Sequence, residues 1–165
     1  MVKIGLLSDT HGDLDPKIFH YFKDVDEIWH AGDIGSLEVI DQLKAFKPLR
    51  AVYGNIDNHE IRMETVLHNR FQIEHVKVLM THIAGKPGKY SKPAYDELQK
   101  EAPNLFICGH SHILLVKFDP TYNMLWMNPG ACGNKGFHQI KTLLRFSITG
   151  ERIHDLEVIE LEKRV

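Results

Sequence analysis

Thiols are scarce in this chain. Its 165 residues include only two cysteines, Cys108 and Cys132, and these form no Cys-x-x-Cys pair. Two separate thiols are too few for a disulfide framework or for a cysteine-based zinc site. A reducing compartment is therefore expected, and side chains other than cysteine must supply any metal ligands.

Long apolar runs are also missing. The N-terminal apolar stretch ends at Ser8 and Asp9, before it reaches the length of a signal-peptide core. No later stretch is apolar enough to span a bilayer. We therefore expect a cytoplasmic protein with no membrane partner.

Neither sign of charge dominates. The formal net charge is only -2, and the chain has no long basic stripe and no series of aromatic residues. Surfaces built to hold nucleic acid are usually strongly basic, so nucleic acid is not the expected partner. Lys86, Lys89 and Lys92 form a local basic segment that either attracts an anionic substrate or is simply a solvated loop.

Repeats and linkers are absent as well. No internal repeat, low-complexity tract or Ser/Gly-rich segment marks a domain boundary. Hydrophobic residues make up 43% of the chain and charged residues 25%, which suits a compact body with a real core. We expect a single domain over residues 1–165 with one functional site.

Strand and helix patterns alternate in the first third of the chain. Strands are predicted at residues 2–7, 27–31 and 49–53, where short apolar runs end in polar loops. Helices are predicted at residues 17–22 and 37–46 from the spacing of their apolar positions. This order favours a parallel α/β sheet.

The rest of the chain has a more antiparallel pattern. Further strands are predicted at residues 70–74, 76–80, 105–108, 114–118, 124–127, 141–148 and 153–161. A third helix is predicted at 92–101, with Ser91 as its N-cap, as Ser36 is for the helix at 37–46. Turns at 119–123 and 149–151 join neighbouring strands, so we expect mixed sheets.

Five of these apolar runs end within a few residues of a side chain that binds metals. The endings are Ser8-Asp9-Thr10-His11-Gly12, Gly32-Asp33, Gly54-Asn55, Thr81-His82 and Gly109-His110-Ser111-His112. In open α/β sheets the ligand crevice lies outside the carboxyl ends of the strands, so we expect these side chains to meet at one sheet edge. A glycine before Asp33, Asn55 and His110 lets the chain turn sharply there.

The ligand types point to transition metals. Two aspartates, one asparagine and four histidines suit Mn²⁺, Fe, Ni²⁺ or Zn²⁺ better than Ca²⁺. Seven ligands are too many for one ion but suffice for two if a carboxylate bridges them. A pair of ions about 3.5 to 4 Å apart is typical of sites that hydrolyse phosphoesters.

Each segment alone also has a simpler interpretation. Asp9 and His11 could cap a strand end, Asp33 could belong to a turn, and His82 could be a hydrogen-bonded core histidine. Five such coincidences at five strand ends favour one metal site. The other histidines are interpreted as surface or packing residues, namely His20, His30, His59, His68, His75, His138 and His154.

The chain resembles the calcineurin-like metallophosphoesterases. The resemblance follows these five endings in order and spacing and continues to Asn128-Pro129-Gly130-Ala131. The short length is similar to that of the YfcE-type phosphodiesterases of bacteria and archaea. The resemblance implies an α/β fold, a four-layer αββα sandwich of two mixed β-sheets flanked by helices.

The resemblance also implies a role for each ligand. Asp9, His11 and His112 would hold one divalent ion, Asn55, His82 and His110 the other, and Asp33 would bridge the two. Asp33, Asn55 and His82 would be catalytic, and Asn55 and His110 would bind substrate. A metal-bridging hydroxide would then hydrolyse a small phosphodiester, with Mn²⁺ as the first expectation and Ni²⁺, Fe or Zn²⁺ as alternatives.

One position departs from the family. Many relatives have a histidine after the metal-binding asparagine, where it can protonate the leaving group, but this chain has Ile56. Isoleucine cannot donate a proton, which predicts lower rates with poor leaving groups. Asp57 or His59 could substitute, although a carboxylate that caps the following segment is the favoured interpretation of Asp57.

Two alternatives to a phosphodiesterase remain. The same site could act on phosphomonoesters or nucleotides, because no cap domain or basic stripe in the sequence separates these substrates. The chain could also be a non-catalytic interaction scaffold, like the retromer subunit that shares this fold with impaired metal chemistry, although its intact ligand set argues against that. The oligomeric state, including a homo-oligomer, stays open.

Overall fold

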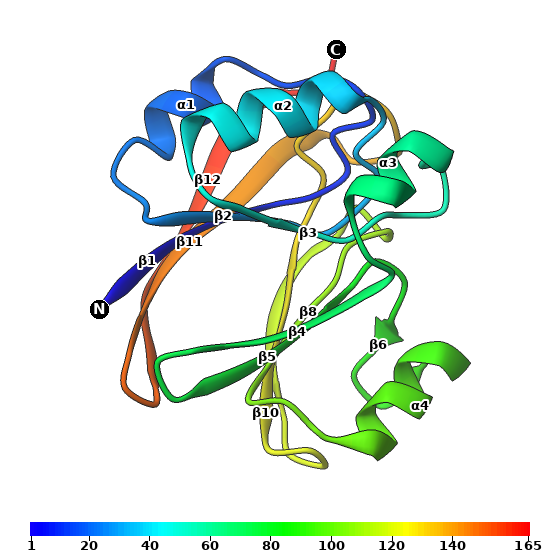
Figure 1. Cartoon of the computed structure of the whole chain (residues 1–165), viewed down its shortest axis with the longest axis vertical. Coiled ribbons are helices and arrows are strands. Elements are labelled where there is room, and N and C mark those ends of the chain that lie inside the picture. The colour runs from blue at the N-terminus through cyan, green and yellow to red at the C-terminus, as the bar shows by residue number, and fades with distance from the viewer.

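The computed structural model describes residues 1–165 and contains two five-stranded sheets packed face to face (Figure 1). The first sheet has the order β12-β11-β1-β2-β3, with bounds Arg152–Lys163, Ile140–Thr149, Val2–Leu7, Glu27–His30 and Leu49–Ala51. The second has the order β4-β5-β8-β10-β9, with bounds His68–Ile73, Val76–Thr81, Leu105–Ile107, Met124–Pro129 and Leu114–Asp119. β6 (Gly85–Lys86) and β7 (Lys89–Tyr90) form a separate short hairpin.

Both sheets are mixed, as expected. In the first, β2 runs parallel to β1 and β3, whereas β11 is antiparallel to β1 and β12. In the second, β8 runs parallel to β5 and β10, whereas β4 and β9 are antiparallel edge strands. Because β1, β2 and β3 run in one direction, and so do β5, β8 and β10, the loops that follow the strands of each set leave from the same edge of their sheet.

Helices cover the outer face of each sheet. α1 (Lys17–Tyr21) and α2 (Leu37–Phe46) lie over the first sheet and α4 (Lys92–Lys100) over the second, while α3 (His59–Glu64) follows β3 (Figure 1). The predicted four-layer αββα sandwich is confirmed.

Three apolar cores hold the four layers together. Neighbouring strand residues point to opposite faces, so Leu6 packs between the sheets while Leu7 packs toward the helices. Trp29 lies in the inter-sheet core, and Trp126 packs with Leu98 of α4. Burial of this kind contributes about 25 cal/mol per Å² of apolar surface, so these contacts fix the two sheets relative to each other.

Several local predictions were wrong. Ser36 and Ser91 occupy the N-cap positions of α2 and α4, but neither side chain makes a capping hydrogen bond. Ser91 Oγ donates instead to the carbonyl of Ile83 at 3.3 Å. α3 and the β6–β7 hairpin were missed, because elements of so few residues leave no clear periodicity. Asn58 caps α3 by accepting a hydrogen bond from the Ile61 amide at 3.1 Å.

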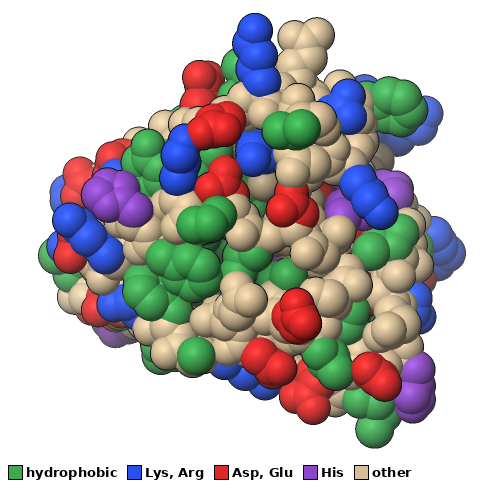
Figure 2. All heavy atoms as spheres, turned by 90° about the horizontal axis from the view of Figure 1, so that it is seen from above, with side chains coloured by type: hydrophobic (Ala, Val, Ile, Leu, Met, Phe, Trp, Pro, Cys, Tyr) green, Lys and Arg blue, Asp and Glu red, His purple; other side chains and the backbone are tan.

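Charge is mixed on the face shown in Figure 2, where lysine and arginine side chains alternate with aspartate and glutamate. That face carries no continuous basic stripe. None of the helices has the length and apolarity that crossing a membrane would require.

Candidate metal centre

Loops after five strands bring the predicted side chains together. Asp9 and His11 follow β1, Asp33 follows β2, and Asn55 follows β3, all in the first sheet. His82 follows β5, and His110 and His112 follow β8, both in the second sheet. The expectation of one sheet edge was wrong in this respect: the edges of two packed sheets together form the site.

The ligand atoms fall into two groups of three. Atoms of Asp9, His11 and His112 lie within 4.8 Å of one another, and so do atoms of Asp33, His82 and His110. Within the first group, His112 Nε2 lies 3.1 Å from Asp9 Oδ1. Within the second, His82 Nε2 lies 3.2 Å from Asp33 Oδ2.

Asp33 lies between the two groups. Its Oδ2 atom is 3.4 Å from His11 Nε2, a ligand atom of the first group, as well as 3.2 Å from His82 Nε2. Asn55 joins the second group through its Oδ1 atom, which is 3.1 Å from His110 Nδ1. The structure thus assembles all seven predicted side chains, and which ion each one holds stays a prediction.

Three buried atoms at the centre have no hydrogen-bond partner: Asp9 Oδ1, His11 Nε2 and His82 Nε2. Leaving a buried polar atom unpaired costs about 1 to 3 kcal/mol, more if it is charged. All three atoms belong to the two groups and face the same small volume. A cation there would satisfy all of them, so this donor set fits divalent metal ions.

Hydrogen bonds behind the ligands fix their orientation. The carbonyl oxygen of Ala31 lies 2.7 Å from His82 Nδ1 and can only accept, so Nδ1 carries the proton and Nε2 points at Asp33. Asp9 Oδ2 accepts from Ser8 Oγ at 2.6 Å and from the His110 amide at 3.2 Å. These contacts leave Asp9 Oδ1 turned toward the histidines.

The backbone is strained where the ligands sit. Eight non-glycine residues have positive φ, and five of them are candidate ligands, namely Asp9, His11, Asp33, His110 and His112. Each such conformation costs about 1 to 3 kcal/mol unless the surroundings enforce it. Strain concentrated on ligands indicates that these side chains are held for a function.

Two glycines allow the loops to approach one another closely. A Cβ on Gly54 would lie 2.0 Å from Asp33 Oδ1, and one on Gly109 would lie 2.2 Å from Ser8 Oγ. No side chain fits in either place, which explains the glycine before Asn55 and before His110.

Carboxylates and histidines at the centre shift each other's pKa values. Burial acts to raise the pKa of Asp9, but His11, His112 and His82 together outweigh it and hold the pKa well below its usual range. Burial acts to lower the pKa of His82, but the carboxylates of Asp33 and Asp9 outweigh it and raise the pKa. The carboxylates and imidazoles thus attract one another in the absence of a cation, so metal ions and protons should compete for these side chains.

Three supporting residues were not assigned from the sequence. The buried carboxylate of Asp57 accepts from the amides of Ile34 at 3.1 Å, Gly35 at 2.9 Å and Gly54 at 2.8 Å. It therefore ties the Asp33 loop to the Asn55 loop and does not cap the following helix. No sequence pattern marks this role, because two of its three partners, the Ile34 and Gly35 amides, are more than 20 residues away in the chain.

His30 and Asn128 support the other loops. His30 Nε2 contacts Thr10 Oγ1 at 3.0 Å, and His30 Nδ1 accepts from the Gly32 amide at 3.1 Å. Asn128 Nδ2 donates to the carbonyl of Gly109 and to Ser111 Oγ, each at 3.0 Å. The family resemblance around Asn128-Pro129-Gly130 was a usable signal for Asn128, whereas His30 was taken for an ordinary packing histidine.

One further histidine lies beside the centre. The ring centroid of His138 is 5.1 Å from that of His112, and its Nδ1 atom is buried without a partner. Ile56, directly after Asn55, is 46% exposed and offers no proton donor.

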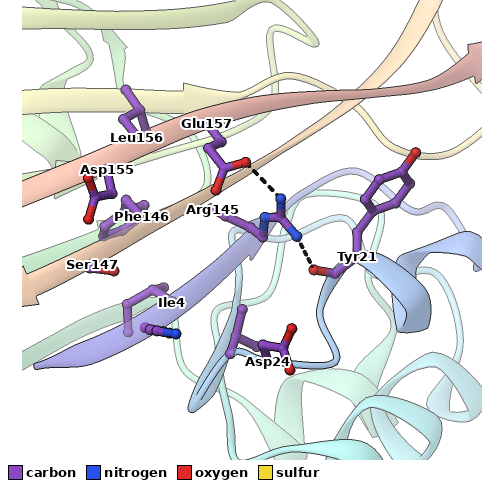
Figure 3. A pocket seen from close by; sticks show the side chains of 11 residues that line it. Ile4, Tyr21, Asp24, Arg145, Phe146, Ser147, Asp155, Leu156 and Glu157 are labelled. Atoms are coloured by element: carbon purple, nitrogen blue, oxygen red, sulfur yellow. Dashed lines mark hydrogen bonds and ion pairs between the residues drawn. The ribbon is translucent and has the colours of Figure 1, made fainter.

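Another cavity lies away from the metal centre. It has a volume of about 620 Å³ and is lined by β1, β11, β12 and the segment around α1, as Figure 3 shows. Arg145 there donates to the carbonyl of Tyr21 and to the Glu157 carboxylate, each at 2.7 Å. No candidate metal ligand lines this cavity, which includes Lys3 and Ile4 from the N-terminal half of β1. Size alone therefore does not identify the functional site.

Comparisons with known proteins agree with the geometry. A family model described as the calcineurin-like phosphoesterase superfamily domain matches residues 2–151. A probable metallophosphoesterase of Methanothermobacter thermautotrophicus is 32% identical over 134 residues, covering 78% of this chain and 76% of that protein. Another, of Methanocaldococcus jannaschii, is 31% identical over 139 residues, covering 78% of this chain and 67% of that protein.

Solved structures share the fold. An archaeal phosphodiesterase matches with a TM-score of 0.78 at 24% identity, over 96% of this chain and 99% of that one. Vps29 of Chaetomium thermophilum matches with a TM-score of 0.75 at 12% identity, over 100% of both chains. At these identities the solved structures support the fold alone. The family model and the curated relatives also show the family. The chain belongs to the calcineurin-like phosphoesterase superfamily, whose members use divalent metals.

Proposed function

We propose that this protein is a phosphodiesterase that depends on two divalent metal ions, with Mn²⁺ as the first candidate. The observation that carries the proposal is the position of Asp33 between two three-ligand groups whose buried atoms lack hydrogen-bond partners. When bound, such a pair of ions would lower the pKa of a water molecule and stabilise negative charge on phosphoryl oxygens.

The chain's own residues would orient the reaction. Asp33 accepts a hydrogen bond from the Ile56 amide at 3.1 Å through its Oδ1 atom, and its other oxygen, Oδ2, would bridge the two groups. Asn55 Oδ1 lies against His110, which leaves the amide Nδ2 free to donate to a phosphoryl oxygen. Asn55 and His110 are exposed, so both can reach a substrate that enters from solvent.

The rim of the centre favours a diester over a monoester. Each of three ligand loops continues into an exposed isoleucine: Ile56 is 46% exposed, Ile83 is 40% and Ile113 is 64%. An apolar rim suits a substrate with an organic group on both sides of phosphorus.

We also propose that residues 1–165 act as one domain with one site, because both sheets contribute ligands to it. Both cysteines are free and buried, which supports the expected reducing, cytoplasmic setting. The proposed substrate is a small phosphoester, and no nucleic-acid or membrane partner is invoked.

Hydrolysis by Mn²⁺-loaded protein tests the function. We expect bis(p-nitrophenyl) phosphate to be hydrolysed with a higher kcat/KM than p-nitrophenyl phosphate, and Asp33→Asn to abolish both activities. A higher value for the monoester would favour a phosphomonoesterase. Absence of any hydrolysis would favour a non-catalytic scaffold, and wild-type activity in Asp33→Asn would remove the bridging role.

A further inference from the structure

A second cavity opens directly beside the candidate metal centre. Its volume is about 250 Å³, and it shares Asn55 and His82 with the centre. Sites for whole drug-sized ligands usually have volumes of about 300 to 1,000 Å³, so this space suits only part of a substrate. For a phosphodiester that part would be one of the two ester groups on phosphorus, called an ester arm below. A molecule whose phosphorus lies at the metal centre would have this cavity as its neighbour.

The walls of the cavity are largely apolar. Tyr53, Leu67, Ile83 and Pro93 contribute rings or aliphatic surface, and Leu67 and Ile83 are exposed to solvent. An exposed apolar wall beside a polar centre favours an aryl or aliphatic group over water. The body of the arm would therefore be apolar.

Arg62 places one fixed positive charge in this cavity. Its guanidinium carbon lies 4.7 Å from the centroid of the Tyr53 ring, and its Nε atom donates to the carbonyl of Asp57 at 2.7 Å. These two contacts hold the guanidinium in place. The distance to the ring is that of a favourable cation–π contact, and neither contact uses the two terminal nitrogens.

No carboxylate neutralises Arg62. Arg50, Arg70 and Arg145 each form an ion pair with a glutamate, whereas Arg62 is in none. Of the two histidines that line the cavity, His68 is occupied by a 2.9 Å contact with Thr81 Oγ1, and His82 belongs to the candidate metal centre. The cavity thus contains an oriented guanidinium whose two terminal nitrogens have no protein partner.

We propose that the cavity binds one ester arm of the substrate and that Arg62 recognises a carboxylate on that arm. This inference rests on the proposed phosphodiesterase function. A guanidinium binds a carboxylate through two parallel hydrogen bonds. The residues that line the cavity include no lysine and no second arginine. A single guanidinium matches the single charge of a carboxylate better than the double charge of a phosphate dianion. Arg62 is then a specificity-determining residue.

A matched pair of substrates tests the inference. p-Nitrophenyl 4-carboxyphenyl phosphate and p-nitrophenyl 4-carbamoylphenyl phosphate share the leaving group and differ in the charge of the other arm. With Mn²⁺-loaded wild-type protein we expect about tenfold higher kcat/KM for the carboxylate. In Arg62→Gln the ratio should fall to about one.

Arg152→Gln is the matched control. Arg152 is an exposed residue of the β11–β12 hairpin, forms no ion pair and does not line the cavity, so this variant should keep the wild-type ratio. Equal kcat/KM for both substrates in the wild type, or a carboxylate preference that survives in Arg62→Gln, overturns the inference.

Equilibrium binding separates this inference from the proposed function. Methylphosphinates that carry a 4-carboxyphenyl or a 4-carbamoylphenyl group have no ester bond to cleave, and calorimetry gives their affinities for the same three proteins. If neither diester is hydrolysed, the proposed function fails. A carboxylate preference in phosphinate binding that Arg62→Gln removes would still support the cavity's role, and its absence would overturn it.

Discussion

His82 Nε2 lies 3.2 Å from Asp33 Oδ2 across the seam between the two sheets. His82 follows β5 of the second sheet and Asp33 follows β2 of the first. The two side chains meet only when the inter-sheet core is packed. The metal centre is therefore complete only when the two sheets are packed together.

Asp57 should contribute strongly to stability. Asp57→Ala would leave three buried backbone amides without an acceptor, at about 1 to 3 kcal/mol each. We expect a loss of about 3 kcal/mol or more in the free energy of unfolding, measured by urea denaturation. Asp41→Ala on the exposed face of α2 is the control, and a similar loss there would contradict the role of Asp57.

Gly54→Ala should disturb metal binding directly. The new Cβ would collide with Asp33 Oδ1 and displace the carboxylate that lies between the two ligand groups. We expect metal affinity, measured by calorimetry, to fall by about tenfold or more. Gly88→Ala has no atom within 4 Å of its new Cβ, so its metal affinity should match that of the wild type. Equal affinities in the two variants would count against the predicted position of Asp33.

His30 should make the metal-free protein less stable in acid. Burial lowers the pKa of His30 to about 4, below its usual value of 6.5. Below pH 6.5 the unfolded chain therefore binds a proton that the folded chain does not, and stability falls as pH drops toward 4. The full effect is about 3 kcal/mol.

The His30 effect is measured as a difference. The free energy of unfolding is measured by urea denaturation for the wild type and for His30→Gln, both in the presence of a chelator. The difference between the two proteins should shrink as pH falls from 7 to 4. Glutamine keeps a polar side chain but does not titrate. Parallel curves would show that His30 is not responsible for the loss in acid.

Ile56→His should restore a proton donor beside the centre. The side chain at position 56 is exposed and follows Asn55 directly, so a histidine there can reach a leaving group. We expect kcat to rise about tenfold or more for diesters with poor leaving groups, and little for p-nitrophenyl esters, which need no protonation. Ile56→Gln has no titratable group and should not reproduce the gain.

The sequence was a good guide to the site and a poorer guide to its surroundings. Asp9, His11, Asp33, His82 and His110 could be found because each follows an apolar run at a strand end. That the strands belong to two sheets was not visible in local patterns, since it depends on packing between distant segments. The resemblance to a known family supplied that part.

Other features depend on contacts that leave no local signal. Arg62 lies on a six-residue helix that was not predicted, and its role follows from stacking on Tyr53. His138 was interpreted as a surface or packing residue. It stands edge-on to His112, and the loop after β10 that leads to it is hydrogen-bonded to Ser8 and Asp9, which follow β1. Tertiary structure, not spacing, brings these residues to the site.

The number of metal ions per chain tests the central claim most directly. Protein loaded with Mn²⁺, passed through a desalting column and measured by elemental analysis should contain two ions per chain. Asp33→Asn should contain fewer, because its amide cannot serve as the shared carboxylate. A wild-type chain that retains no transition metal under these conditions would contradict the account.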